Sequence, residues 1–150
     1  MSSKADSSDI EPGRFLSSIR GMLRDLGLPD CVVVIEESVH AWATARGLKV
    51  KSPFLPAMAV TVNGVPTSVF RNRLTRDMQT RVKNRMEFSG FEVAQLLRSS
   101  AFLEHLVLHE AAHHVLPHAS EEDCDQWAFE HLAGRRERED SPAVQSGEAG

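Results

Sequence analysis

A five-residue segment, His-Glu-Ala-Ala-His at positions 109–113, constrains the fold of this chain more than any other feature. Its two histidines, His109 and His113, are four residues apart, so on an α-helix they lie one turn apart on the same face. In that arrangement both imidazoles can bind one metal ion, and Glu110 stands beside the first of them. The fold must therefore place a helix here, with one side open to the ion.

The flanking sequence predicts this helix. Ser99-Ser100 offers an N-cap, and residues 101–116 contain no Gly or Pro before Pro117 ends the segment. Apolar residues recur at helical spacing and predict a buried side: Phe102, Leu103, Leu106, Val107 and Val115. His-Glu-x-x-His on a helix is the zinc-binding pattern of hydrolases, in which the glutamate acts as general base. We therefore predict that the two histidines are metal ligands and that Glu110 is the catalytic base.

A third ligand is expected because catalytic zinc takes three protein ligands and leaves one position for water. Ser120, with Asp123 three residues later, predicts the start of a second helix. On that helix Glu121 and Asp125 lie one turn apart and share a face. Glu121 can complete the metal site, and Asp125 can accept a hydrogen bond from the free ring nitrogen of a ligand histidine.

The joined pattern resembles the gluzincin metallopeptidases, whose HExxH helix is followed by a helix with a Glu ligand and a supporting Asp. Residues 121–128, Glu-Glu-Asp-Cys-Asp-Gln-Trp-Ala, are similar to the ExxAD/N-x-[FW]-A pattern of ImmA/IrrE-type and other minimal gluzincins. The resemblance covers residues 103–132. It implies one Zn²⁺, a peptide or protein substrate, and a zincin-like fold in which a small, mostly antiparallel sheet packs on the active-site helix.

Two departures from the family pattern concern the ligands. Ala112 stands where many relatives have Gly, and only seven residues separate His113 from Glu121. The short gap leaves Glu122 open as the third ligand, but we favour Glu121 because only it has an Asp four residues later. Metzincins place a third histidine six residues after the second, with Gly between, so His118 is the weaker alternative.

The resemblance also implies a hydrogen-bond donor to the developing oxyanion. Many gluzincins use Tyr or His, and this chain has no Tyr, so His, Arg or a backbone N–H must serve. The candidates by sequence proximity are His118, His114 and His131. We interpret His105, one turn before His109, as a packing or supporting residue, Cys124 as a small buried group, and Trp127 as core.

Patterns elsewhere predict a single α+β domain at 12–134 between disordered tails at 1–11 and 135–150. Helices are expected over residues 12–26, 38–46, 75–88 and 91–97, and a buried strand over 31–35. Two strands, 57–62 and 65–71, flank Asn63-Gly64, a strong hairpin signal. Pro66 predicts that the second strand either lies at an edge of the sheet or is shortened. By the resemblance, this hairpin offers an edge strand that binds an extended substrate.

Composition and charge bear on the expected partners and compartment of the protein. The net charge of −4 gives no reason to expect nucleic acid, and two Cys suit a reducing compartment. From the sequence we expect neither a signal peptide nor an apolar membrane span. We therefore expect a cytoplasmic protein without a membrane partner. Six Lys and Arg residues within 71–85 are interpreted as a solvated helix face, because no aromatic residues interleave with them.

Three functions of different classes follow from these patterns. We favour a zinc metallopeptidase, a hydrolase that uses Glu110 as its base. The first alternative is a catalytically inactive gluzincin-like fold in which zinc is structural. The second is a regulatory or nucleic-acid-binding module that acts through the basic residues 71–85.

Overall fold

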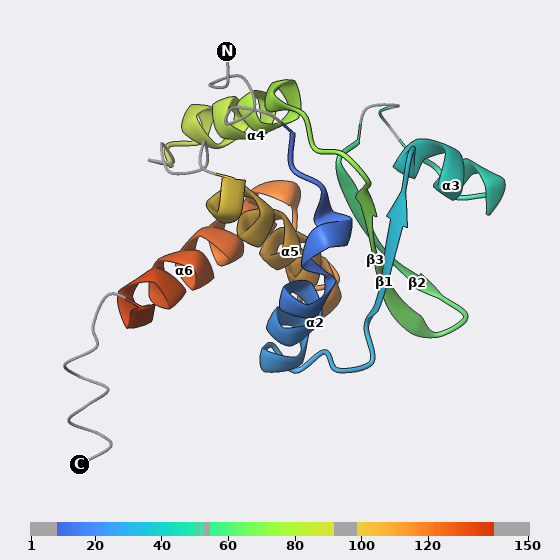
Figure 1. Ribbon diagram of the computed structural model, residues 1–150, viewed down its shortest axis with the longest axis horizontal. Coiled ribbons are helices and arrows are strands. Elements are labelled where there is room, and N and C mark those ends of the chain that lie inside the picture. Colours follow the sequence, from blue (N-terminus) through green and yellow to red (C-terminus); the bar gives the residue numbers. More distant parts are fainter. Residues whose placement is uncertain (1–8, 51, 53–54, 92–98, 140–150) are drawn as a thin grey trace.

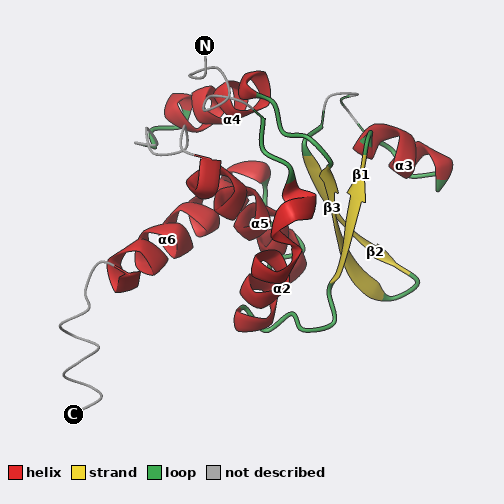
Figure 2. Ribbon diagram, viewed as in Figure 1, coloured by secondary structure: helices red, strands yellow, loops and turns green. Residues whose placement is uncertain are grey.

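The computed structural model describes residues 9–50, 52, 55–91 and 99–139. Helices and a small three-stranded mixed sheet form an α+β fold, which confirms the predicted fold class (Figure 2). The elements in chain order are the 3₁₀ helix η1 (Pro12–Phe15), α2 (Leu16–Asp25), β1 (Val32–Glu36), α3 (Val39–Ala45), β2 (Ala57–Val62), β3 (Val65–Arg71), α4 (Arg76–Phe88), α5 (Ser99–Val115) and α6 (Glu121–Glu139).

The sheet has the order β1-β3-β2, with β1 parallel and β2 antiparallel to β3. The prediction of a mostly antiparallel sheet was therefore wrong, because one of its two strand pairs is parallel. The hairpin between β2 and β3 forms as predicted. Its turn residues Asn63 and Gly64 both have positive φ, 53° and 80°, which suits a tight hairpin turn.

Of the two alternatives for Pro66, the edge position is wrong, since β3 is the central strand. Pro66 pairs with Thr61 close to the turn, whereas pairing with β1 begins only at Thr67, opposite Val32. The missing N–H of Pro66 therefore interrupts no pairing with β1. β1 is the opposite edge strand and is only partly buried, in contrast to the fully buried strand that its β-branched residues predicted.

Side chains alternate across β3, so the sheet separates two apolar clusters. On one face Val69 packs with α3 through Val39 and Trp42. On the other face Phe70 belongs to the main core, which contains residues of α2, α4, α5 and α6. α5 packs against α6, α2, β2 and β3, and therefore lies at the centre of the molecule (Figure 1).

Because α5 is central, even its polar residues are buried. His105, His109 and Glu110 are 0%, 4% and 6% exposed, beside the fully buried Ala111 and Ala112. Burial of titratable side chains is costly unless they are paired or serve a site. These three residues therefore mark the region where a functional centre is expected.

Helix termini agree with much of the sequence analysis. The Thr75 and Ser120 side chains accept hydrogen bonds from the backbone N–H groups of Met78 and Asp123, at 3.2 and 3.0 Å, so both act as N-caps. α5 begins at Ser99 itself, where an N-cap was expected.

At the borders of the expected domain, α6 continues beyond residue 134 to Glu139, and Ile10 forms a bridge with Leu74. The helix expected at 91–97 lies outside the described residues, apart from Phe91. Within the described chain, no helix has the length and apolar character needed to cross a membrane.

Candidate metal centre

The three expected ligands converge where α5 meets the first turn of α6. His109 Nε2 lies 2.9 Å from Glu121 Oε1, and His113 Nε2 lies 3.2 Å from Glu121 Oε2. The two imidazoles are in edge contact, with ring centroids 5.0 Å apart. Helical spacing predicted that the two histidines share one face of their helix and that Glu121 lies on the next helix. The structure brings these three side chains together.

The donor set suits a zinc ion. Two imidazole nitrogens and one carboxylate are common ligands of catalytic zinc, and ligands about 2.0–2.1 Å from a tetrahedral ion lie about 3.3 Å from one another. The nitrogen–oxygen distances of 2.9 and 3.2 Å are close to that spacing. His113 and Glu121 are partly open to solvent, so a further position remains accessible. This group could hold a metal ion.

Asp125 lies behind His109, where it was expected. Its Oδ1 accepts a hydrogen bond from His109 Nδ1–H at 2.8 Å, and the carboxylate is almost fully buried. A proton on Nδ1 leaves the Nε2 lone pair free for a metal. Burial alone would raise the pKa of Asp125, but hydrogen bonds from His105 and His109 and the charge of Arg85 lower it well below its ordinary value.

Arg85 of α4 is a site residue that the sequence analysis missed. Its Nε and Nη2 donate to the two carboxylate oxygens of Asp125, at 3.1 and 2.9 Å. In the sequence it is one of several cations in the basic stretch, and no local signal separates it from the others. Only the tertiary fold, which brings Arg85 of α4 to Asp125 of α6, reveals its role.

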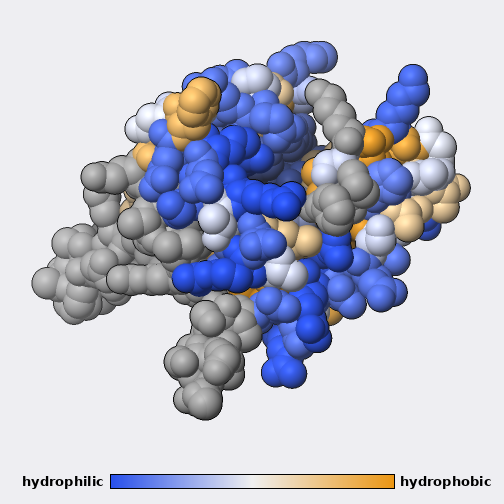
Figure 3. Space-filling model, turned by 90° about the horizontal axis from the view of Figure 1, so that it is seen from above, coloured by the Kyte–Doolittle hydropathy of each residue, from blue (hydrophilic) through white to orange (hydrophobic). Residues whose placement is uncertain are grey.

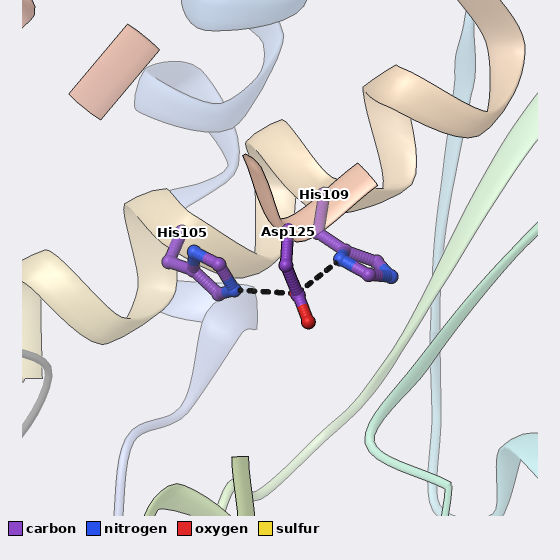
Figure 4. A group of neighbouring side chains, drawn as sticks. All are labelled: His105, His109 and Asp125. Carbon is purple, nitrogen blue, oxygen red and sulfur yellow. Dashed lines mark hydrogen bonds and ion pairs between the residues drawn. The ribbon is translucent and has the colours of Figure 1, made fainter. Parts of the chain in front are cut away.

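His105, His109 and Asp125 form a second group that could hold a metal ion. The two histidines of α5 flank the carboxylate, and His105 Nε2 lies 3.4 Å from Asp125 Oδ1 (Figure 4). All three residues are buried. Burial is the main cause that lowers the pKa of His105, so its ring is neutral beside Asp125.

The charges of His109, His113 and Glu121, the first group that could hold a metal ion, depend on one another. Burial would lower the pKa of His109, but hydrogen bonds with Asp125 and Glu121 raise it to about 10. The hydrogen bond with Glu121 likewise raises the pKa of His113, and both histidines lower the pKa of Glu121 well below its usual range. The two histidines and Glu121 therefore hold one another in place as ion pairs.

Glu110 faces a cavity of about 240 Å³ beside these ligands. Burial raises the pKa of its carboxyl group, while the positive charges of His109 and His113 act in the opposite direction. A carboxylate at such a position is a candidate proton acceptor for a water molecule in the cavity. The cavity is lined by Leu55, Pro56, Ala57, Met58, Ala59, Val82, Arg85, Leu106, His109, Glu110, His113 and Glu121.

β2 borders the cavity with an unpaired edge among the described residues. The backbone N–H of Arg71 donates to the carbonyl of Pro56 at 2.9 Å, so that carbonyl points towards β3. Hydrogen-bonding groups alternate along an antiparallel strand, so those of Ala57 and Ala59 point away from β3. This edge can add another extended chain.

The three histidines expected as possible oxyanion donors are not among the described residues that line this cavity. His118 is exposed, His114 Nε2 lies 3.4 Å from Ser68 Oγ, and His131 stacks on Trp127 with ring centroids 3.7 Å apart. Successive helical residues point about 100° apart, so proximity in sequence to His113 did not place His114 in the site.

Two further residues near the ligands are clarified by the structure. Glu122 is exposed and belongs to neither metal-capable group of the described residues, so the geometry favours Glu121 as the ligand. Cys124 is buried, as expected, and its Sγ also lies 3.5 Å from His113 Nδ1. The thiol therefore contacts the second histidine on the nitrogen opposite Glu121.

No family model, no curated protein and no solved structure matches this chain. The gluzincin resemblance therefore depends on the quoted motif residues, and any functional conclusion depends on their geometry.

Proposed function

We propose that this protein is a zinc-dependent metallopeptidase that uses Glu110 as general base. The observation that carries the proposal is the convergence of His109, His113 and Glu121 beside a cavity that also contains Glu110 and the free edge of β2. Ligands, base and a strand edge for a peptide occur together there. A structural zinc site needs only the first of these.

The two metal-capable groups differ in how suitable they are for catalysis. Asp125 of the second group already binds the Arg85 guanidinium through both oxygens, so a cation beside it would be repelled. That group is also fully buried, whereas Glu121 of the first is largely exposed. We therefore assign Zn²⁺ to His109, His113 and Glu121, with Asp125 orienting His109.

When bound, zinc supplies a Lewis acid that lowers the pKa of a water molecule towards about 7 and polarises a carbonyl group. Glu110 takes the proton of the attacking water and delivers it to the leaving amine. Asp125 keeps the proton of His109 on Nδ1, which fixes the ring orientation. The outward backbone groups of Ala57 and Ala59 bind the substrate in an extended form.

The same arrangement supports a zincin-like fold of the gluzincin type. An active-site helix packs against a hairpin strand, and the following helix begins with the third ligand. The nucleic-acid alternative gains no support from the basic stretch, because several of its cations are engaged by acids. Arg73 pairs with Asp9 at 3.6 Å and Lys83 with Glu87 at 3.1 Å, besides the pair of Arg85 with Asp125.

Zinc content tests the ligand assignment. We expect about one zinc per chain in the wild type and a steep loss in His113→Ala and in Glu121→Ala, because each removes one of three ligands. His118→Ala and Glu122→Ala are matched controls that remove exposed residues of the same types nearby and should keep the metal. Full retention in both ligand variants would move the metal to the group around His105.

Peptide cleavage tests catalysis separately. Glu110→Gln keeps the size of the side chain but cannot accept the proton, so we expect zinc to remain and cleavage of a quenched fluorescent peptide mixture to fall at least about 100-fold. Glu122→Gln is the control and should keep full activity. If the zinc-loaded wild type cleaves nothing and zinc removal unfolds it, the metal is structural and the peptidase proposal is wrong.

A further inference from the structure

Arg85 borders the cavity beside the candidate metal centre, but the proposed chemistry uses it only through Asp125. Its side chain is 46% exposed although both Asp125 oxygens bind it. It lines the same cavity as Glu110 and His113. Figure 3 shows the face that carries α4, whose visible surface is largely hydrophilic. A charged group of a ligand can approach this side without losing all of its hydration.

Two of the five guanidinium N–H donors of Arg85 are hydrogen-bonded to Asp125. Nε and one N–H of Nη2 donate to Asp125 Oδ2 and Oδ1. The other three belong to Nη1 and Nη2, at the far end of the group, and no acceptor for them occurs among the described residues. That end is a planar fork of parallel N–H groups, the geometry that binds a carboxylate through both oxygens.

Asp125 also fixes the plane of this fork. The carboxylate is buried and is itself held by His109 Nδ1 at 2.8 Å, with His105 Nε2 at 3.4 Å. An arginine held at two points loses little further conformational freedom when a second acceptor binds. Arg85 is therefore organised in advance for one more planar anion.

The contacts of Arg85 favour a role in binding the substrate. Among the described residues its guanidinium bonds to Asp125 and not to His109, His113 or Glu121, so it is linked to the Nε2 atom that faces Glu121 only through Asp125 and His109. Arg85 and the three expected ligands nevertheless line one cavity of about 240 Å³. Residues of an extended chain are spaced by roughly 3.3 Å, so a chain bound in this cavity brings a group one or two residues from the cleaved bond towards the fork.

We propose that the Nη1–Nη2 fork of Arg85 binds a substrate carboxylate one or two residues from the cleaved bond. This inference rests on the proposed peptidase function and names its substrate class: peptides with an acidic side chain or a C-terminal carboxylate at that place. Glu110 and Glu121 also border the cavity and repel an anion. Selection for the carboxylate therefore requires both Arg85 and the bound metal.

Three synthetic probes on the zinc-loaded full chain test the inference. All carry a hydroxamate, which binds zinc by itself, followed by leucine and one further residue. That residue is alanine with a free carboxylate in the first, alanine amide in the second and aspartate amide in the third. We expect at least one carboxylate probe to bind about tenfold tighter than the alanine amide in calorimetry, as charge-assisted hydrogen bonds allow. Which one does so distinguishes a C-terminal carboxylate from an acidic side chain.

Variants of α4 then test whether Arg85 causes the preference for a carboxylate probe. Arg85→Met keeps the apolar stem without the fork and should bind carboxylate and amide probes within about twofold of each other. Arg85→Lys keeps the charge without the fork and should lose most of the preference. Lys83→Met removes a neighbouring charge of the same helix and should keep all of it. If Arg85→Met loses zinc or does not fold, Arg85→Lys provides the comparison.

The outcomes separate this inference from the proposed function. If the chain binds no zinc, or if no hydroxamate binds the zinc-loaded chain, the metal centre is wrong and the inference fails with it. If all three probes bind the wild type equally, the Arg85 inference is wrong while the metal centre stands. A carboxylate preference that survives undiminished in Arg85→Met or Arg85→Lys likewise overturns it.

Discussion

Replacing Asp125 with asparagine tests the link between the buried polar residues and the metal centre. The change keeps the shape of the side chain but removes its charge and one of its two acceptor oxygens. In the wild type these oxygens accept hydrogen bonds from His109 Nδ1 and from two nitrogens of Arg85. An asparagine can satisfy only part of this set, and its amide group would then face another donor.

We expect Asp125→Asn to lower two quantities, the folding stability and the affinity for the metal. An unsatisfied buried donor costs about 1–3 kcal/mol, and breaking a buried ion pair costs about 3–5 kcal/mol. Because the Arg85 side chain is 46% exposed, water can replace part of its lost interaction, so we expect about 2–3 kcal/mol of lost stability. Loss of the partner that orients a ligand histidine typically weakens metal binding about 10–100-fold.

Two measurements on Asp125→Asn check these values. Urea unfolding of the metal-free protein gives the change in stability, and competition with a chelator gives the zinc affinity. Glu122→Gln, the same loss of charge at an exposed position of α6, should change neither by more than about 0.5 kcal/mol. A zinc affinity within threefold of wild type would show that Asp125 does not orient His109, and our reading of the site would be refuted.

Other predictions concern the scaffold, and urea unfolding checks each of them. Phe102 is fully buried in the main core, so Phe102→Ala should cost about 3–5 kcal/mol, whereas Phe88→Ala, at a residue 94% exposed, should cost less than about 0.5 kcal/mol. Similar costs for the two would contradict the assigned core. Gly64 has a φ of 80°, so Gly64→Ala should cost about 1–2 kcal/mol, and an unchanged stability would contradict the turn geometry.

Local patterns predicted those parts of the site that depend on helical spacing. His109 and His113 share a face because they are four residues apart, and Glu121 follows them after one short loop. Arg85 could not be predicted in this way. Its contact with Asp125 spans 40 residues of sequence, so only the tertiary fold brings the two side chains together.

The predictions that the structure corrects or leaves without support have the same physical origin. The position of Pro66 was inferred from its missing N–H alone, but the strand register places that gap where β1 has not yet begun to pair. His118, His114 and His131 were chosen for their nearness in sequence, whereas helix rotation and tertiary packing decide which side chains reach a cavity. The local sequence predicts which types of residue can form a site. The packing and register of the helices and strands decide which of those residues reach it.

The charges of the site would hold it in place before the proposed metal binds. Arg85, Asp125, His109 and Glu121 alternate in sign, with neighbouring groups 2.8 to 3.1 Å apart. This row joins α4, α5 and α6, so the same contacts connect the three helices and position His109 and Glu121. In the proposed metal centre, a metal ion would take the place of the proton between His109 and Glu121, and the rest of the row would remain as it is. Burial of charge makes α5 costly as a structural helix, and the proposed metal centre gives that cost a function.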